Sequence, residues 1–141
     1  MEEQCTMRKL VEMSEKVRTS TLELERSKVN YYYHNETYTD SMSVVSEQRQ
    51  KLKLITEDSS FERDDQIIQM ELMTKLVSAY RLHAQDHNFA LFRLRHSTSA
   101  LSKLLQIAKT LLTENSPIDQ HDEENELRSL IQHAETVHFR Y

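Results

Sequence analysis

Two histidines four residues apart are the best candidates for metal chemistry in the sequence. On one helix face, the spacing of His83 and His87 allows two imidazoles to bind one metal ion. No second pair of ligands with a matching spacing accompanies them. Glu135 and His138 have the Glu-x-x-His spacing of di-iron bundles, but those bundles need the motif twice and two further carboxylates. We therefore expect no cofactor and interpret His87 as a packing residue, with His83 and His87 kept as the metal candidates.

Covalent catalysis lacks a matched set of residues. Cys5 is the one cysteine, and no base can be assigned to it. The serines have no nucleophile-elbow context, and the absence of glycine excludes Gly-rich phosphate loops. Paired carboxylates such as Asp64 and Asp65 are adjacent, so on a helix they point to different faces. We expect that the protein is not an enzyme.

The composition predicts long helices with few turns. The chain of 141 residues has no glycine and one proline, whereas tight hairpins and bulges depend on glycine. No stretch longer than seven residues lacks a charge, and charges interrupt the N-terminal segment, so we expect neither a membrane span nor a signal peptide. The single cysteine favours a reducing compartment, and we expect a cytoplasmic or nuclear protein.

Two sets of capping residues divide the chain. Ser59 followed by Glu62 has the capping-box spacing that opens a helix. Ser116 can cap a third helix, because Pro117 suits the first helical position. We predict one helical domain over residues 1–141, with helices at about 3–56 and about 60–113 and an acidic helix at about 117–139.

The first helix has one complete seven-residue column of apolar or aromatic side chains. An exact repeat of seven predicts a left-handed supercoiled seam. The two companion columns, three and four positions later, are half polar, so the seam is narrow. Weak helix formers at 34–41 and 96–99 leave open the alternative that the long helices break there. The column consists of Leu10, Val17, Leu24, Tyr31, Tyr38, Val45 and Leu52.

The second helix has an apolar face that is too wide for a two-stranded coil. Its apolar residues recur at alternating spacings of three and four and extend into a flanking column, so it needs at least two neighbours. The predicted fold class is all-α: a long antiparallel helical hairpin or coiled coil with a shorter third helix, as part of a multi-helix bundle. The missing neighbours would come from copies of the chain or from other proteins.

An antiparallel hairpin that folds back near residue 58 sets a register for the two long helices. It places Tyr38 near Ala79, which pairs a large side chain with a small one. The same register brings Thr19–Thr21 near Ser97–Ser99 as a small polar layer.

The stretch VNYYYHNETY, residues 29–38, contains four of the six tyrosines. Consecutive helical residues are rotated by about 100°, so Tyr31, Tyr32 and Tyr33 cannot all face one partner. Tyr31 and Tyr38 belong to the seam, whereas Tyr32 and Tyr33 indicate a second contact, for which we expect a partner helix. A stacking platform for single-stranded nucleic acid would need a basic groove, which the neighbouring residues do not provide.

The net charge of −5 is concentrated in residues 117–141, which contain six acidic and two basic residues. A balanced body with an acidic end argues against nucleic acid or anionic lipid as the main partner. Our first hypothesis is a non-enzymatic structural or scaffold subunit of a hetero-oligomeric coiled-coil complex, of the cytoskeletal, kinetochore, ciliary or vesicle-tethering type. The alternatives are a self-assembling helical bundle with a core ligand or metal site, and a regulatory adaptor that docks through its acidic C-terminal helix.

Helix packing makes other coiled-coil proteins the expected partners. A hetero-oligomer is favoured over a homo-oligomer, because the second helix has more apolar surface than the first and third helices can cover. The residues expected to bind partners are Tyr31, Tyr32, Tyr33, Tyr38, Met70, Met73, Val77, Tyr80, Leu91, Leu94, Leu101, Leu105, Leu127, Leu130 and Val137.

Overall fold

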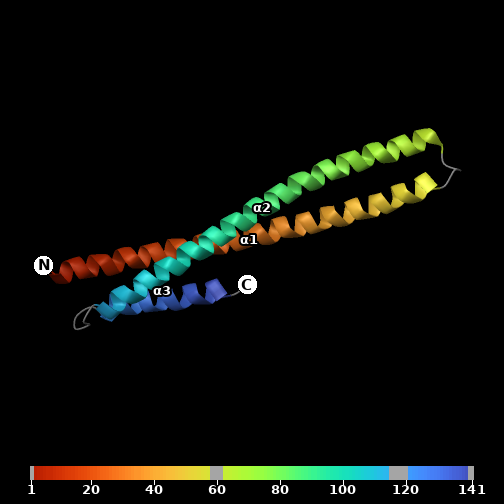
Figure 1. Cartoon of the computed structure of the whole chain (residues 1–141). Helices are drawn as coiled ribbons and strands as arrows, with labels where there is room; N and C mark the ends of the chain where they lie inside the picture. Colours follow the sequence, from red (N-terminus) through yellow and green to blue (C-terminus); the bar gives the residue numbers. More distant parts are fainter. Residues whose placement is uncertain (1, 58–61, 115–120, 140–141) are drawn as a thin grey trace. The chain divides into compact units, whose positions relative to one another are not determined.

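The structure is a computed structural model that describes residues 2–57, 62–114 and 121–139. It contains three helices: α1 (Glu2–Glu57), α2 (Arg63–Glu114) and α3 (His121–Phe139) (Figure 1). The predicted all-α class, with a pair of long helices and a shorter third helix, is therefore confirmed. The helices follow the local composition, which is rich in strong helix formers.

The helix ends lie close to the predicted ones. Helix α2 begins at Arg63 rather than near residue 60, and the predicted start of the third helix near residue 117 lies outside the described residues. The proposed caps at Ser59 and Ser116 lie outside the described residues. Both long helices run without interruption through the weak helix formers at 34–41 and 96–99, so the alternative of broken helices is not what the structure contains.

The chain divides into two compact units. The three-helix unit comprises Met1–Val29 and Phe92–Tyr141, and the two-helix unit comprises Asn30–Leu91. Helices α1 and α2 each contribute to both units, whereas α3 belongs to the three-helix unit alone. The single domain over residues 1–141 stays a prediction.

In the two-helix unit, the described parts of α1 and α2 lie side by side and antiparallel (Figure 1). Gln48 contacts Gln69, and Tyr38 contacts Tyr80, so residue numbers fall along α1 as they rise along α2. Tyr38 therefore lies within one residue of its predicted position opposite Ala79.

In the three-helix unit, α3 packs parallel to α1 and antiparallel to α2. Arg18 contacts Glu126 and Lys28 contacts Val137, so both numbers rise together. Ser97 of α2 bonds to Ser27 of α1, with 2.9 Å between the hydroxyl oxygens. The predicted polar layer is therefore wrong in its α1 member, because Ser97 is paired with Ser27 instead of Thr19–Thr21.

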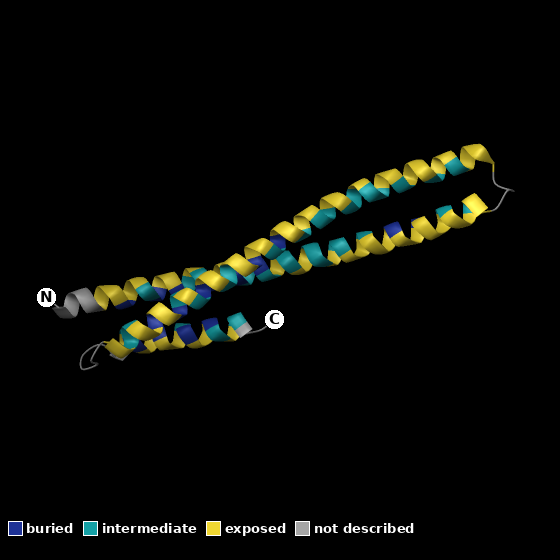
Figure 2. Ribbon diagram, viewed as in Figure 1, coloured by how far each residue is buried: buried dark blue, intermediate teal, exposed yellow. Residues whose placement is uncertain are grey.

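The seven-residue column of α1 forms the seam in both units. Every member is buried or half-buried, as the exact repeat of seven predicts. The buried residues lie where the helices of a unit face one another (Figure 2). Nearly all the buried apolar residues belong to the three-helix unit, since only Val45 and Ala90 are buried in the two-helix unit.

Candidate helix-packing interface

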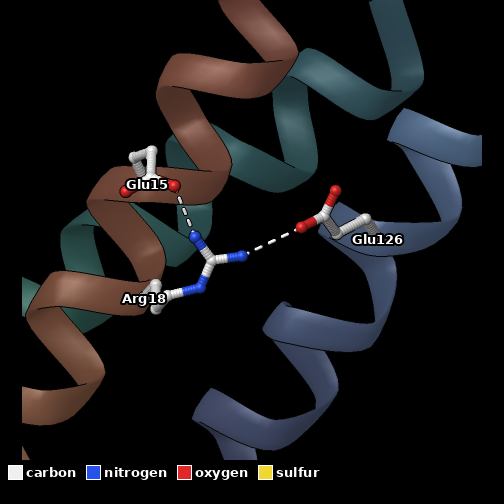
Figure 3. Close-up of polar contacts among 3 residues, drawn as sticks. All are labelled: Glu15, Arg18 and Glu126. Atoms are coloured by element: carbon white, nitrogen blue, oxygen red, sulfur yellow. Dashed lines mark hydrogen bonds and ion pairs between the residues drawn. The ribbon is translucent and has the colours of Figure 1, made fainter.

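Helix α3 is held to α1 and α2 by apolar side chains with acidic residues on both flanks. Leu127, Ile131 and Ala134 are buried between the helices. Glu126 accepts a hydrogen bond from Arg18 of α1, with 2.9 Å between Nη2 and Oε1, and Glu135 forms an ion pair with Lys109 of α2. Arg18 also contacts Glu15 of its own helix (Figure 3). The acidic amphipathic helix α3 therefore packs against α1 and α2 with a basic side chain of each helix beside one of its carboxylates.

Small polar side chains make room for α3 on α1. Ser14 and Thr21 lie four positions after seam residues and are buried. The Thr21 hydroxyl donates to the carbonyl oxygen of Val17 at 2.7 Å, so its burial leaves no unpaired donor. Lys28, the next residue of this column, donates to the carbonyl oxygen of Val137 near the end of α3. The column is therefore covered by α3 although it is polar.

The two-helix unit is held together at its seam by an aromatic cluster. The ring of Tyr38 stacks on that of Tyr80, with centroids 5.5 Å apart, and on the imidazole of His87, with centroids 4.8 Å apart. The ring centroid of Tyr31 lies 5.4 Å from the centroid of the same imidazole. The Nε2 atom of His87 lies 3.1 Å from the amide oxygen of Asn35, in a hydrogen bond between α2 and α1. Stacked rings and side-chain hydrogen bonds thus replace a buried aliphatic core here.

The hydroxyls of Tyr38 and Tyr80 are hydrogen-bonded, with 3.1 Å between the oxygens. This bond, the negative charge that an ionised Tyr80 would place nearby, and partial desolvation raise the pKa of Tyr38 above its ordinary value of 10.0. The Tyr38 phenol is therefore neutral at physiological pH.

The metal candidates have no third ligand among the described residues. His83 is half-buried, and His87 is bonded to Asn35 and stacked on Tyr38. Within the described ranges, no group of three or more His, Cys, Asp or Glu side chains is placed to hold a metal ion. His87 is placed as a packing residue of the seam.

The residues expected to bind partners fall into three groups by exposure. Tyr32, Tyr33 and Met70 are exposed, at 54%, 65% and 55%. The buried ones all belong to the three-helix unit and are Leu94, Leu101, Leu105 and Leu127. The half-buried ones are Tyr31, Tyr38, Met73, Val77, Tyr80, Leu91, Leu130 and Val137.

Four exposed residues of the two-helix unit occupy columns whose members in the three-helix unit contact α3 or are buried. Tyr32 lies in the seven-residue column of Arg18, and Met42 lies in that of Lys28; both of these earlier residues contact α3. Ile67 lies in the column of Lys109, which contacts Glu135 of α3, and Met70 lies in that of the buried Leu105. We call this surface the Met42 face; its members are Tyr32, Met42, Ile67 and Met70, exposed at 54%, 45%, 44% and 55%.

A separate groove of about 550 Å³ lies between α1 and α2 in the three-helix unit. None of the described side chains of α3 lines it. Its floor is apolar, since Met13, Ile107 and Leu111 line it. The polar lining residues are Lys9, Glu12, Lys16, Gln106, Thr110 and Glu114.

The acidic start of α3 is used within its own unit. Glu126 is bonded to Arg18, and Glu124 is 3% exposed, with its Oε1 atom buried and without a hydrogen-bond partner. Of the acidic residues near this end, Asp122 is exposed and Glu123 half-buried. This acidic segment therefore offers a partner less charge than the sequence suggests.

None of the described helices combines the length and apolar composition that crossing a membrane requires. Comparison of the chain with protein-family models, curated proteins and solved structures gave no match. The function therefore has to be argued from the chain's own packing surfaces.

Sequence reasoning missed two features of these surfaces. Asn35 was assigned no role, although it bonds to His87. Ser14 and Thr21 were read only as weakening the seam, although they are buried beneath α3. The signal for the second feature was present, because small polar residues repeating every seven positions beside an apolar column mark a site of close helix approach.

Proposed function

We propose that the protein is a non-enzymatic structural or scaffold subunit of a hetero-oligomeric helical complex in the cytoplasm or nucleus. It acts by packing its helices against those of other coiled-coil proteins. The assemblies that use such subunits include cytoskeletal, kinetochore, ciliary and vesicle-tethering complexes.

The observation that carries this proposal is the exposure of the Met42 face. In the three-helix unit Arg18, Lys28 and Lys109 of the corresponding columns contact α3 and Leu105 is buried, whereas Tyr32, Met42, Ile67 and Met70 have no such neighbour among the described residues and are each more than 40% exposed. Exposed apolar residues that align along a helix pair are typical of protein-binding surfaces. A partner helix on this face would turn the two-helix unit into a three-helix arrangement like that around α3.

Affinity capture with the tagged full chain tests the proposal. A double variant, Tyr32→Lys with Met70→Lys, places charge on the Met42 face. The matched control is Leu22→Lys with Val29→Lys, which changes two exposed apolar residues of α1 outside this face. We expect a helical protein that is retained by the wild type and the control, is lost from the double variant, and binds again when reconstituted from purified components.

Two results would contradict the proposed function. If the purified chain alone forms a monodisperse, fully helical homo-oligomer in which the Met42 face is protected from hydrogen exchange, the hetero-oligomeric function is wrong. The same holds if every captured protein binds the double variant as tightly as the wild type.

A further inference from the structure

One surface of the two-helix unit contains basic residues and no described acidic residue, and the apolar pattern does not require this separation of charge. The columns that contain the Met42 face also contain the basic residues Arg49, Lys53, Arg63 and Arg81, all exposed. None of the described acidic residues of this unit lies in these columns. The acidic residues occupy the other faces and are Glu36, Asp40, Glu47, Glu57, Glu62, Asp64, Asp65, Glu71 and Asp86.

The basic residues share the columns of the Met42 face on both helices. Arg49 and Lys53 belong to α1, and Arg63 and Arg81 belong to α2. All the ion pairs found in the described residues lie in the three-helix unit, so these four side chains have no acidic partner among the described residues of their own unit. Each is long enough to reach over the edge of an apolar strip while keeping its charge in water.

Helix α3 shows how such a surface is filled. It buries Leu127 and Ile131 between the helices and directs Glu126 to Arg18 on α1 and Glu135 to Lys109 on α2. The columns of the Met42 face likewise combine apolar residues with bases on both helices. An occupant that matches it has an apolar strip with carboxylates on both sides.

We infer that the Met42 face binds an acidic amphipathic helix of a partner protein. This inference rests on the proposed function, because it specifies the chemistry of the partner. Carboxylates of the incoming helix pair with Arg49 and Lys53 on one flank and with Arg81 on the other. Its apolar side covers Met42, Met70 and their neighbours.

The length of the face argues for a partner other than α3 of a second copy. The columns that contain the Met42 face extend from Tyr32 to Thr56 along α1, which corresponds to about 36 Å at 1.5 Å per residue. Helix α3 has 19 residues, or about 28 Å, and its apolar side is already buried in its own unit. A helix of about 24 residues covers the whole face.

Synthetic helical peptides of 24 residues provide the probe. They share one apolar strip and differ only in the flanking positions, which carry Glu, Gln or Lys. Binding to the full-length protein is measured by fluorescence anisotropy at two salt concentrations. We expect the Glu peptide to bind at least about ten-fold more tightly than the Lys peptide, with the difference shrinking at high salt.

Charge reversal locates the binding site. The triple variant Arg49→Glu, Lys53→Glu and Arg81→Glu should lose at least about ten-fold in affinity for the Glu peptide and gain affinity for the Lys peptide. The matched control reverses Lys51 and Lys75, which lie outside the Met42 face, and should leave the preference unchanged. Helicity is checked by circular dichroism, and the three single variants replace the triple variant if its helicity falls.

The outcomes separate this inference from the proposed function. Equal binding of the Glu and Lys peptides, or a triple variant that keeps the acidic preference, overturns the inference. If a single-stranded oligonucleotide displaces the Glu peptide and binds more tightly, the face recognises phosphates and the inference is again wrong. If a captured partner is lost with Tyr32→Lys and Met70→Lys yet is unaffected by the charge reversals, the inference fails while the proposed function stands.

Discussion

Leu24 and Leu52 belong to the same column of α1, yet their surroundings differ. Leu24, in the three-helix unit, is completely buried, whereas Leu52, in the two-helix unit, is half-buried. The positions four residues after Val17 and Val45 of this column show the same contrast, since Thr21 is buried and Arg49 is exposed. Burial in this protein therefore depends on the number of helices around a position more than on its place in the repeat.

The two units also use different interactions at their seams. The three-helix unit buries aliphatic residues such as Leu10, Leu101 and Leu127 without any exposure. The two-helix unit relies on stacked rings and on the Asn35–His87 bond. A seam between two helices stays open to water at its sides, so aromatic residues with polar tips suit it better than aliphatic ones. This difference predicts how strongly each unit is destabilised when a contact is removed.

Removal of α3 is expected to have the largest effect. A chain that ends at Glu114 would convert the three-helix unit into two helices and expose Val17 and Leu24. Because α3 buries Leu127 and Ile131, at about 1.5–3 kcal/mol each, we expect a loss of about 3–6 kcal/mol in the free energy of unfolding of this unit. Residue-resolved hydrogen exchange should show the amide protection of Val17 falling to that of Val45.

The amide of Tyr38 is the internal control for this truncation, since α3 does not belong to its unit. Undiminished protection at Val17 would mean that two helices are sufficient for this unit and that the contrast with the two-helix unit has another cause.

Truncating one leucine in each unit gives the next largest effect. Leu24→Ala should cost about 3 kcal/mol, because it leaves a cavity in a fully packed site, whereas Leu52→Ala should cost about 1 kcal/mol. The free energies come from urea unfolding followed by circular dichroism at one protein concentration. Equal losses would contradict the difference in packing, since the two residues occupy the same column and receive the same substitution.

The positions of helices and of the α1 seam could be predicted from the sequence because both depend on local pattern. The seven-residue column from Leu10 to Leu52 determines which face of α1 is buried, whatever packs on it. The absence of glycine and the single proline restrict the chain to few turns. The coarse register also followed, since Tyr38 lies opposite Tyr80, one residue from Ala79.

The side on which α3 packs could not be predicted. Ser14 and Thr21 are polar, and a pattern of polar and apolar residues cannot show that a hydroxyl will be paired with the carbonyl of Val17 and then buried. The pairing of large with small residues also failed at Tyr38, because two aromatic rings stack instead of fitting against an alanine. The sequence alone indicates the Met42 face only in part, because its basic residues lie in columns of two different helices.

A smaller effect is expected from the ion pair that fastens α3 to α1. Arg18 and Glu126 are both partly exposed, so a double-mutant cycle with Arg18→Gln and Glu126→Gln should give a coupling of about 0.2–1 kcal/mol. The coupling should decrease when salt is added. A coupling well above this range would show that charge pairs, and not the burial of Leu127, decide the position of α3.

The smallest effect at neutral pH is expected at the tyrosine pair of the two-helix unit. The bond to Tyr80, the charge that Tyr80 would carry and partial desolvation raise the pKa of Tyr38 above 10.0 in the folded state. The folded state therefore holds its proton more tightly than the unfolded state does. Stability from this pair is fully present below pH 10 and is lost as the pH rises through the folded pKa.

Tyr80→Phe removes the bond and the charge, so the pKa of Tyr38 should fall towards 10.0. Ring-labelled tyrosine NMR measures this pKa, and Tyr33→Phe is the control because Tyr33 lies outside the seam. An unchanged Tyr38 pKa in Tyr80→Phe would mean that burial by the helices governs it, and the two-helix seam would then exclude water as the three-helix core does.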